Sequence, residues 1–157
     1  MLELITDRTA ADVKRWRVLQ AKGYNAMTAD EKAEWDSGMK GAYNVTDLNR
    51  VGNAYKYLQN RLSEAGYLQG YEIIPKTDWK ASDVPTTADF KRYIRSVNSI
   101  RNALTTLRTT PPQLDETGGI DFQEANNLEQ ILFDTEYLLN QLQAIYHYNG
   151  DIYCGEI

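Results

Sequence analysis

The stretch Thr86–Leu107, TTADFKRYIRSVNSIRNALTTL, decides the fold. Its apolar residues recur with gaps of 3, 4, 3, 4 and 3, a spacing typical of a narrow helical seam that packs against other helices. They are Phe90, Tyr93, Val97, Ile100, Leu104 and Leu107. Five cations lie on another face: Lys91, Arg92, Arg95, Arg101 and Arg108. The stretch therefore predicts a helix over about 87–108 with an apolar face and a basic face, each of which needs a partner.

Two other stretches repeat the same gaps. One predicts a helix over about 45–65 and carries Leu48, Val51, Tyr55, Leu58, Leu62 and Ala65. The other predicts a helix over about 122–147 and carries Leu128, Ile131, Thr135, Leu138, Leu142 and Ile145. Gly66 is a suitable stop for the first helix, since glycine tolerates the left-handed terminating position. Three long helices with polar connections favour an up-and-down bundle.

Two shorter helices are expected ahead of this bundle. Thr9 with Asp12, and Thr28 with Glu31, have the spacing of capping boxes and predict helices over about 10–22 and 29–36. The fold class is therefore mainly α, a helical bundle in a single domain over 1–157. Within it we expect an N-terminal helical subunit (1–66), a helical hairpin (86–147) and a tail (148–157). A small β feature could form at the termini or at Tyr71–Ile74.

Composition restricts the class of protein. The net charge is -5, which argues against a nucleic-acid partner, because such proteins are usually basic. No run approaches the ~20 apolar residues that span a bilayer, and the N-terminus lacks the apolar core of a signal peptide. We therefore expect no membrane association. A lone cysteine, Cys154, excludes an intrachain disulfide.

Charge is distributed unevenly along the chain. Residues 67–108 carry a net charge of +3, whereas 109–157 contain nine acids and no lysine or arginine. We expect the basic face of the 87–108 helix to lie against the acidic 122–147 helix, and the alternative is an external acidic partner. Exposed ion pairs contribute only ~0–1 kcal/mol each, so they would direct pairing more than stabilise it.

Catalytic groups are scarce in the sequence. His147 is the only histidine, and we expect it to cap a helix end rather than to act with Cys154 as a nucleophile–base pair. The acidic clusters, including Glu129, Asp134 and Glu136, are expected on solvated helix faces rather than across a glycosidase cleft. No glycine-rich phosphate loop or nucleophile elbow appears. We predict no enzymatic activity, no metal and no cofactor.

Aromatic residues are the more informative group. The chain has 11 tyrosines and 3 tryptophans, many in or beside connections. They either cap the ends of the bundle or form a contact platform for sugar or protein. The candidate binding surface comprises Trp35, Tyr43, Tyr71, Trp79, Tyr148 and Tyr153.

Several blocks of sequence resemble a known kind of module. The N-terminal blocks are LITDRT-x-x-DV (4–13), MTADEKAEW (27–35), GMKGAYN (38–44) and TDLNRV (46–51), and the C-terminal blocks are NNLEQIL (126–132) and GDIYCGE (150–156). Together they resemble a helical module of phage and prophage tail or virion proteins from Gram-positive gut bacteria. The resemblance implies a virion structural context and brings no catalytic residue.

The sequence therefore favours two functions. The first is a non-enzymatic phage tail or virion structural module that assembles with other tail proteins or with itself. It would lie in the virion, and in the host bacterial cytoplasm before assembly. The alternative is a carbohydrate- or cell-surface-binding module that uses the loop aromatics on a glycan. A small hydrolase is the least favoured, because no nucleophile–base set is evident.

Overall fold

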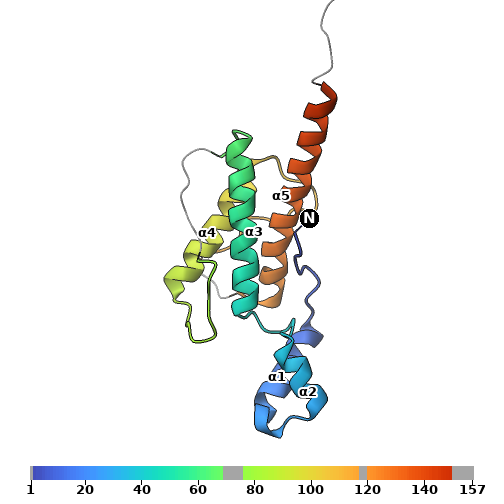
Figure 1. The fold of residues 1–157 in the computed structure, drawn as a ribbon, viewed down its shortest axis with the longest axis vertical. Helices are drawn as coiled ribbons and strands as arrows, with labels where there is room; N and C mark the ends of the chain where they lie inside the picture. The colour runs from blue at the N-terminus through green and yellow to red at the C-terminus, as the bar shows by residue number, and fades with distance from the viewer. Residues whose placement is uncertain (1, 69–75, 117–119, 150–157) are drawn as a thin grey trace, which may run out of the picture.

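A computed structural model describes residues 2–68, 76–116 and 120–149, the last four of these by their backbone alone. Five α-helices are present in these ranges (Figure 1): α1 Ala10–Lys22, α2 Ala29–Asp36, α3 Val45–Glu64, α4 Thr87–Ala103 and α5 Phe122–Asn149. The described residues contain no strand, so the prediction of a mainly α fold is confirmed. Residues 2–9 are extended but form no sheet. Tyr71–Ile74 and the tail residues 150–157 lie outside the described residues.

Local capping explains where the helices begin. Helices α1 to α4 each start with a capping box, in which an N-cap side chain and the third helical residue exchange hydrogen bonds. The N-caps are Thr9, Thr28, Asn44 and Thr86. Asp121 and Glu124 exchange the same pair of bonds at the start of α5, at 2.9 and 2.8 Å. Every predicted helix start is thus confirmed.

The main core lies between α3, α4 and α5, each of which packs on the other two. The predicted seams supply most of it, because Leu48, Val51, Tyr55, Leu58 and Leu62 of α3 are all buried. Their main neighbours are Tyr93, Val97 and Ile100 of α4 and Leu128, Ile131, Leu132 and Leu139 of α5. A second, small cluster joins α1 and α2 through Leu19, Met27 and Met39.

The three long helices run in the same direction, which differs from the expected up-and-down bundle and from a 86–147 hairpin. In Figure 1 the earlier-coloured end of each helix lies at the lower end of the bundle. Tyr43 before α3, Phe90 in α4 and Phe122 in α5 line one common space, so these helix starts converge. The physical reason is that the connections 65–86 and 104–121 are long enough to return along a helix.

Three extended segments lie beside the three long helices. We call them return segments: 2–8 beside α5, 76–80 beside α3 and 111–116 beside α4. Residue numbers rise along each segment as they fall along the helix: Leu2 N donates to Glu136, Ile5 N to Glu129 and Arg8 N to Asn126. Beside α3, Gly52 makes room, since a Cβ there would lie 3.0 Å from the Lys76 carbonyl oxygen.

An asparagine of each long helix fixes the neighbouring return segment. Its carboxamide accepts from the backbone N–H of one residue and donates to the carbonyl oxygen of that same residue. The pairs are Asn49 with Trp79 (2.7 and 2.9 Å), Asn98 with Leu114 (3.0 and 3.0 Å) and Asn126 with Arg8 (3.0 and 2.9 Å). These bonds satisfy backbone groups that have no sheet partner.

Replacing Asn126 with alanine should lower the free energy of unfolding by about 1–3 kcal/mol, because the N–H and carbonyl oxygen of the buried Arg8 lose their partners. Its neighbour Asn127 provides a matched control, as its side chain makes no hydrogen bond among the described residues. Asn127→Ala should change stability by no more than about 0.5 kcal/mol. Urea denaturation followed by circular dichroism measures both, and equal losses would contradict this role for Asn126.

Helix α4 ends at Ala103, so the predicted extent of 87–108 is too long. Leu104 already has an extended backbone, with φ -128° and ψ 167°. Two β-branched threonines at 105 and 106 follow, and such residues lose side-chain freedom in a helix. Beyond them Thr109 and Thr110 donate to Asp134 of α5. The chain therefore leaves the helix early in order to turn back along it.

The basic face of α4 meets its own return segment rather than α5. Arg101 Nε donates to the Pro111 carbonyl oxygen at 2.7 Å, and Arg95 Nε lies 2.6 Å from a Glu116 oxygen. The buried Glu129 of α5 is instead paired with Arg8 and Arg50. The expected match between basic α4 and acidic α5 is therefore wrong for the described ion pairs.

Candidate functional site

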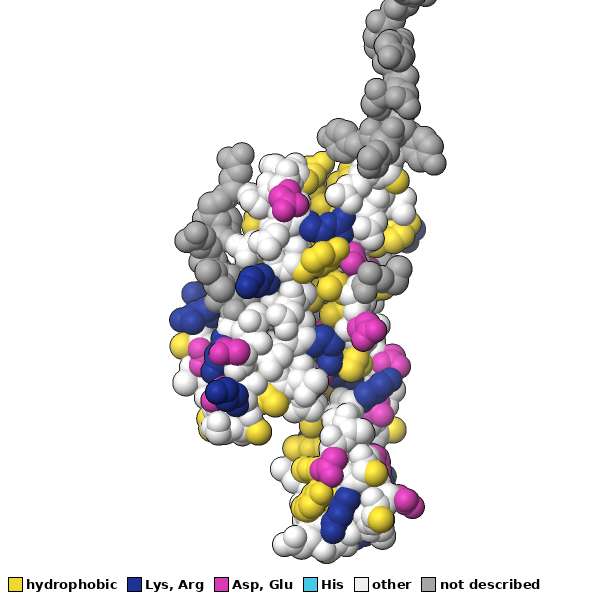
Figure 2. Space-filling view, viewed as in Figure 1, with side chains coloured by type: hydrophobic (Ala, Val, Ile, Leu, Met, Phe, Trp, Pro, Cys, Tyr) yellow, Lys and Arg dark blue, Asp and Glu magenta, His cyan; other side chains and the backbone are white. Residues whose placement is uncertain are grey.

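An open groove of about 730 Å³ lies where α1 faces the starts of the long helices. One wall is a single face of α1, formed by Ala10, Val13, Lys14 and Arg17, which have the i, i+3, i+4, i+7 spacing of neighbours on a helix. The facing side consists of Phe90, Ile120, Phe122 and Ala125, and the turn 40–43 joins the two. Figure 2 shows hydrophobic side chains at the junction of the α1–α2 lobe with the bundle. We refer to this space as the groove.

The shared direction of the long helices produces the apolar lining. Tyr43 precedes the N-cap of α3, Phe90 lies in the first turn of α4, and Phe122 is the first residue of α5. An aromatic residue near the start of each helix therefore arrives at the same place. An up-and-down arrangement would have put Phe90 at the opposite end from the other two. Sequence reasoning missed this surface because it depends on helix direction.

Positive charge surrounds the groove. Four cations line it, Arg8, Lys14, Arg17 and Lys40, against one carboxylate, Asp121. Lys40 is engaged by Asp7, with Nζ 2.6 Å from a carboxylate oxygen. Lys14 and Arg17 are exposed, and their side chains make no ion pair or hydrogen bond within the described ranges. The converging helix N-termini carry partial positive charge, which is offset by their own capping carboxylates Asp47, Asp89 and Glu124.

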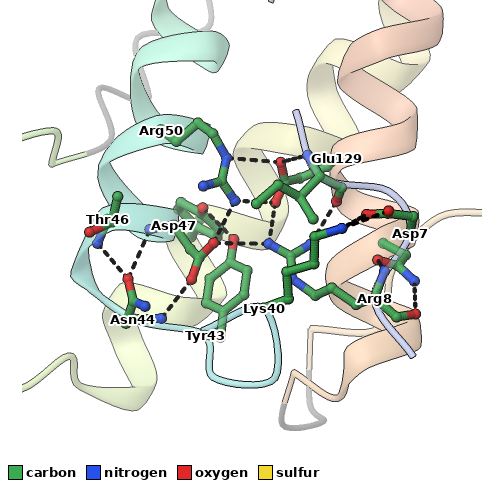
Figure 3. Close-up of polar contacts among 12 residues, drawn as sticks. Asp7, Arg8, Lys40, Tyr43, Asn44, Thr46, Asp47, Arg50 and Glu129 are labelled. Carbon is green, nitrogen blue, oxygen red and sulfur yellow. Dashed lines mark hydrogen bonds and ion pairs between the residues drawn. The ribbon is translucent and has the colours of Figure 1, made fainter. Parts of the chain in front are cut away.

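Four charged residues form a tetrad beside the groove (Figure 3), in which Arg8, Asp47 and Glu129 are buried and Arg50 is partly exposed. Arg8 Nη2 donates to Asp47 at 2.9 Å and to Glu129 at 2.7 Å. Arg50 donates to the same two carboxylates. Glu129 is 0% exposed, and its second oxygen also accepts from the Ile5 N–H at 2.6 Å. The tetrad therefore ties the N-terminal return segment to α3 and α5.

Two tyrosines extend the polar region from the tetrad to α4. The Tyr43 ring lies 5.5 Å from the Arg8 guanidinium, within the range of a cation–π contact. Its hydroxyl is 2.7 Å from that of Tyr93. Burial raises the pKa of both phenols above the ordinary value. Both hydroxyls therefore stay protonated at neutral pH and serve as hydrogen-bonding groups.

The chemistry of the tetrad is that of a structural support. Two carboxylates and two guanidiniums give a net charge of zero, and each carboxylate accepts hydrogen bonds from both arginines. A general base needs a carboxylate that can approach a substrate proton. Neither Asp47 nor Glu129 can approach a substrate proton, because both carboxylates are buried and bonded to the arginines. We therefore assign the tetrad a positioning role, in which it fixes Arg8 at the edge of the groove.

One polar atom at this edge remains without a partner. Arg8 is 4% exposed, yet its Nε is buried and has no hydrogen-bond acceptor. Its other groups are engaged, as Nη1 donates to the Ile5 carbonyl oxygen at 2.7 Å. A buried N–H without an acceptor carries a desolvation penalty.

The predicted aromatic platform is dispersed in the part of the chain that the structure describes. Trp35 packs on the small α1–α2 cluster, whereas Tyr43 and Trp79 pack on the main core. Lys76 Nζ lies 4.5 Å from the centre of the Trp79 ring, and Arg8 lies over the Tyr43 ring. Tyr71, Tyr153 and the side chain of Tyr148 lie outside the described residues. The structure therefore brings Tyr43 into the groove and leaves Trp35 and Trp79 outside its lining.

The acidic residues of α5 differ from their expected exposure. Glu129, Asp134 and Glu136 are 0%, 3% and 3% exposed, so their predicted place on a solvated face is wrong. They are buried because distant segments supply partners: Glu136 accepts from Leu2 N of the N-terminal return segment, and Asp134 accepts from Thr109 and Thr110 in the connection after α4. Cys154 and the His147 side chain lie outside the described residues.

The described residues hold neither a candidate metal cluster nor a candidate membrane-spanning helix. Among the described residues, no group of three or more histidine, cysteine, aspartate or glutamate side chains could hold a metal ion. Across the same ranges, no helix combines the length and apolar character needed to cross a bilayer. Comparison of the chain with protein-family models, with curated proteins and with solved structures found no match.

Proposed function

We propose that the chain is a non-enzymatic structural module of a phage or prophage tail or virion, and that it acts by protein–protein assembly. The sequence blocks within 4–51, together with 126–132 and 150–156, support the virion context through their resemblance to such modules. The observation that carries the assembly role is the exposed apolar surface of α5. Glycan binding is less favoured, because cations already contact the rings of Tyr43 and Trp79, two of the aromatic residues that such a site would use.

Helix α5 extends beyond its partners in the bundle. Figure 1 shows its C-terminal end projecting past the end of α3. Ile145, which the seam predicts to be buried, is 53% exposed. Phe133 and Tyr137 are 38% and 49% exposed and lie one turn apart on the same face. Ile145 lies about two turns beyond Tyr137 on the adjoining face. Apolar side chains arranged in this way are typical of a surface that another chain covers.

The charge pattern of the same segment suits contact between identical chains. Residues 137–149, YLLNQLQAIYHYN, contain no lysine, arginine, aspartate or glutamate. Two copies of this segment can therefore lie together without repulsion between like charges. Asn140 and Gln143 of this segment accept hydrogen bonds from Arg61 of α3, and Gln141 is exposed. We accordingly propose that α5 provides a self-association surface.

This proposal predicts concentration-dependent association. In sedimentation velocity, the wild-type chain should shift from monomer to dimer or higher species as concentration rises. Tyr137→Glu together with Ile145→Glu should weaken the association about tenfold or more, since each new carboxylate would be desolvated in the contact. Val18→Glu is a matched control, because Val18 is 50% exposed on α1. A monomer at every accessible concentration would overturn the proposal, as would equal weakening by the control.

A further inference from the structure

The groove combines two features that usually occur apart on a soluble protein. Its lining is largely apolar and includes Val13, Phe90 and Phe122. Its α1 wall carries Lys14 and Arg17, which have no partner in the described part of the chain. An apolar side chain would be desolvated between the walls, while an adjacent negative group would meet these two cations. The groove therefore complements a ligand that is both apolar and acidic.

Arg8 supplies an independent indication of an acceptor. Its Nε–H is buried and unsatisfied although the rest of the guanidinium is bonded on three sides. The tetrad balances the charge of Arg8 but does not supply this missing acceptor. A carbonyl or carboxylate oxygen of a bound chain would remove the penalty once a shift of the Arg8 side chain exposed this N–H.

We infer that the groove binds an acidic segment of a partner protein, anchored by an aromatic or large aliphatic side chain. The anchor lies between Val13 of α1 and Phe122 of α5, and flanking carboxylates reach Lys14 and Arg17. This inference rests on the proposed assembly role only in that the ligand is a protein. It concerns a different face from the self-association surface of α5.

A nucleic acid is the competing ligand of similar chemistry, and the charges disfavour it. Binding of a phosphate backbone draws on several lysines and arginines, whereas here Lys40 is engaged by Asp7 and Arg8 by the tetrad. Two free cations and an apolar lining fit a short peptide with a few carboxylates better than a polyanion.

The test begins with a random peptide library selected on the wild-type chain. The selected peptides should be rich in aspartate and glutamate beside phenylalanine, tryptophan, leucine or isoleucine. Calorimetry with the best peptide should then show binding about tenfold weaker to Lys14→Glu/Arg17→Glu, because two attractive contacts become repulsive. Lys56→Glu/Arg108→Glu is the matched control, since both residues are exposed, unpaired among the described residues and remote from the groove lining.

Each result bears directly on the inference. Selected peptides without acidic enrichment, equal losses in the groove and control variants, or tighter binding of a single-stranded oligothymidine would overturn it. Circular dichroism of both variants confirms that they fold. Sedimentation of Lys14→Glu/Arg17→Glu separates the two proposals, because loss of peptide binding should leave association through α5 unchanged.

Discussion

Replacing Glu129 with alanine is expected to lower the free energy of unfolding by about 3–5 kcal/mol, the range for breaking a buried ion pair by removing one partner. Glu129 is fully buried and accepts hydrogen bonds from Arg8, Arg50 and the Ile5 N–H. Its loss would leave Arg8 with Asp47 as its one carboxylate partner, which Arg50 shares. Urea denaturation followed by circular dichroism provides the measurement.

A double variant separates the effect of the unpaired charge on the free energy of unfolding from the effect of lost packing. Arg8→Met with Glu129→Leu removes one charge of each sign and leaves the Asp47–Arg50 pair intact. We expect this double variant to be more stable than Glu129→Ala, because no unpaired charge remains in the interior. Glu64→Ala at the exposed end of α3 should change stability by no more than about 0.5 kcal/mol. A double variant as unstable as Glu129→Ala would show that charge is not the cause.

Local sequence determined the helix starts but not the helix directions. A capping box such as Thr86 with Asp89 involves residues three apart, so the sequence predicts it well. The direction of α4 relative to α3 depends instead on the path of the chain over 65–86. The apolar seam of a helix is the same whether its neighbour runs parallel or antiparallel. Seam spacing therefore predicted which residues form the core and left the topology open.

The buried acids show that local sequence also fails to predict which polar residues are buried. Glu129 has no nearby sequence feature that separates it from a solvated helical glutamate. Its burial depends on Arg8, 121 positions away in the chain. One signal was present in the asparagines, since Asn49, Asn98 and Asn126 lie inside helices where asparagine is a poor helix former. A helical asparagine beside an apolar seam could have indicated a side chain that holds a passing segment.

Replacing Gly41 with alanine is expected to displace α1 from the bundle. A Cβ at this position would lie 2.1 Å from the Asp12 carbonyl oxygen and 2.8 Å from the Val13 nitrogen. Both are backbone atoms, so no side-chain rotation can relieve the overlap, and α1 itself must move. Overpacking typically costs about 1–3 kcal/mol, and we expect the upper end because a whole helix is displaced.

Gly23→Ala separates this overlap from the general effect of losing a glycine. Gly23 has φ +76°, which disfavours alanine, but nothing lies within 4 Å of its Cβ position. Its substitution should cost about 1 kcal/mol through backbone strain alone and leave the groove in place. Urea denaturation and calorimetry with the selected peptide distinguish the two variants. Gly41→Ala should also lose peptide binding, because α1 carries Val13, Lys14 and Arg17 into the groove wall. Equal stability and equal peptide affinity in the two variants would contradict the close contact of α1 with the turn at Gly41.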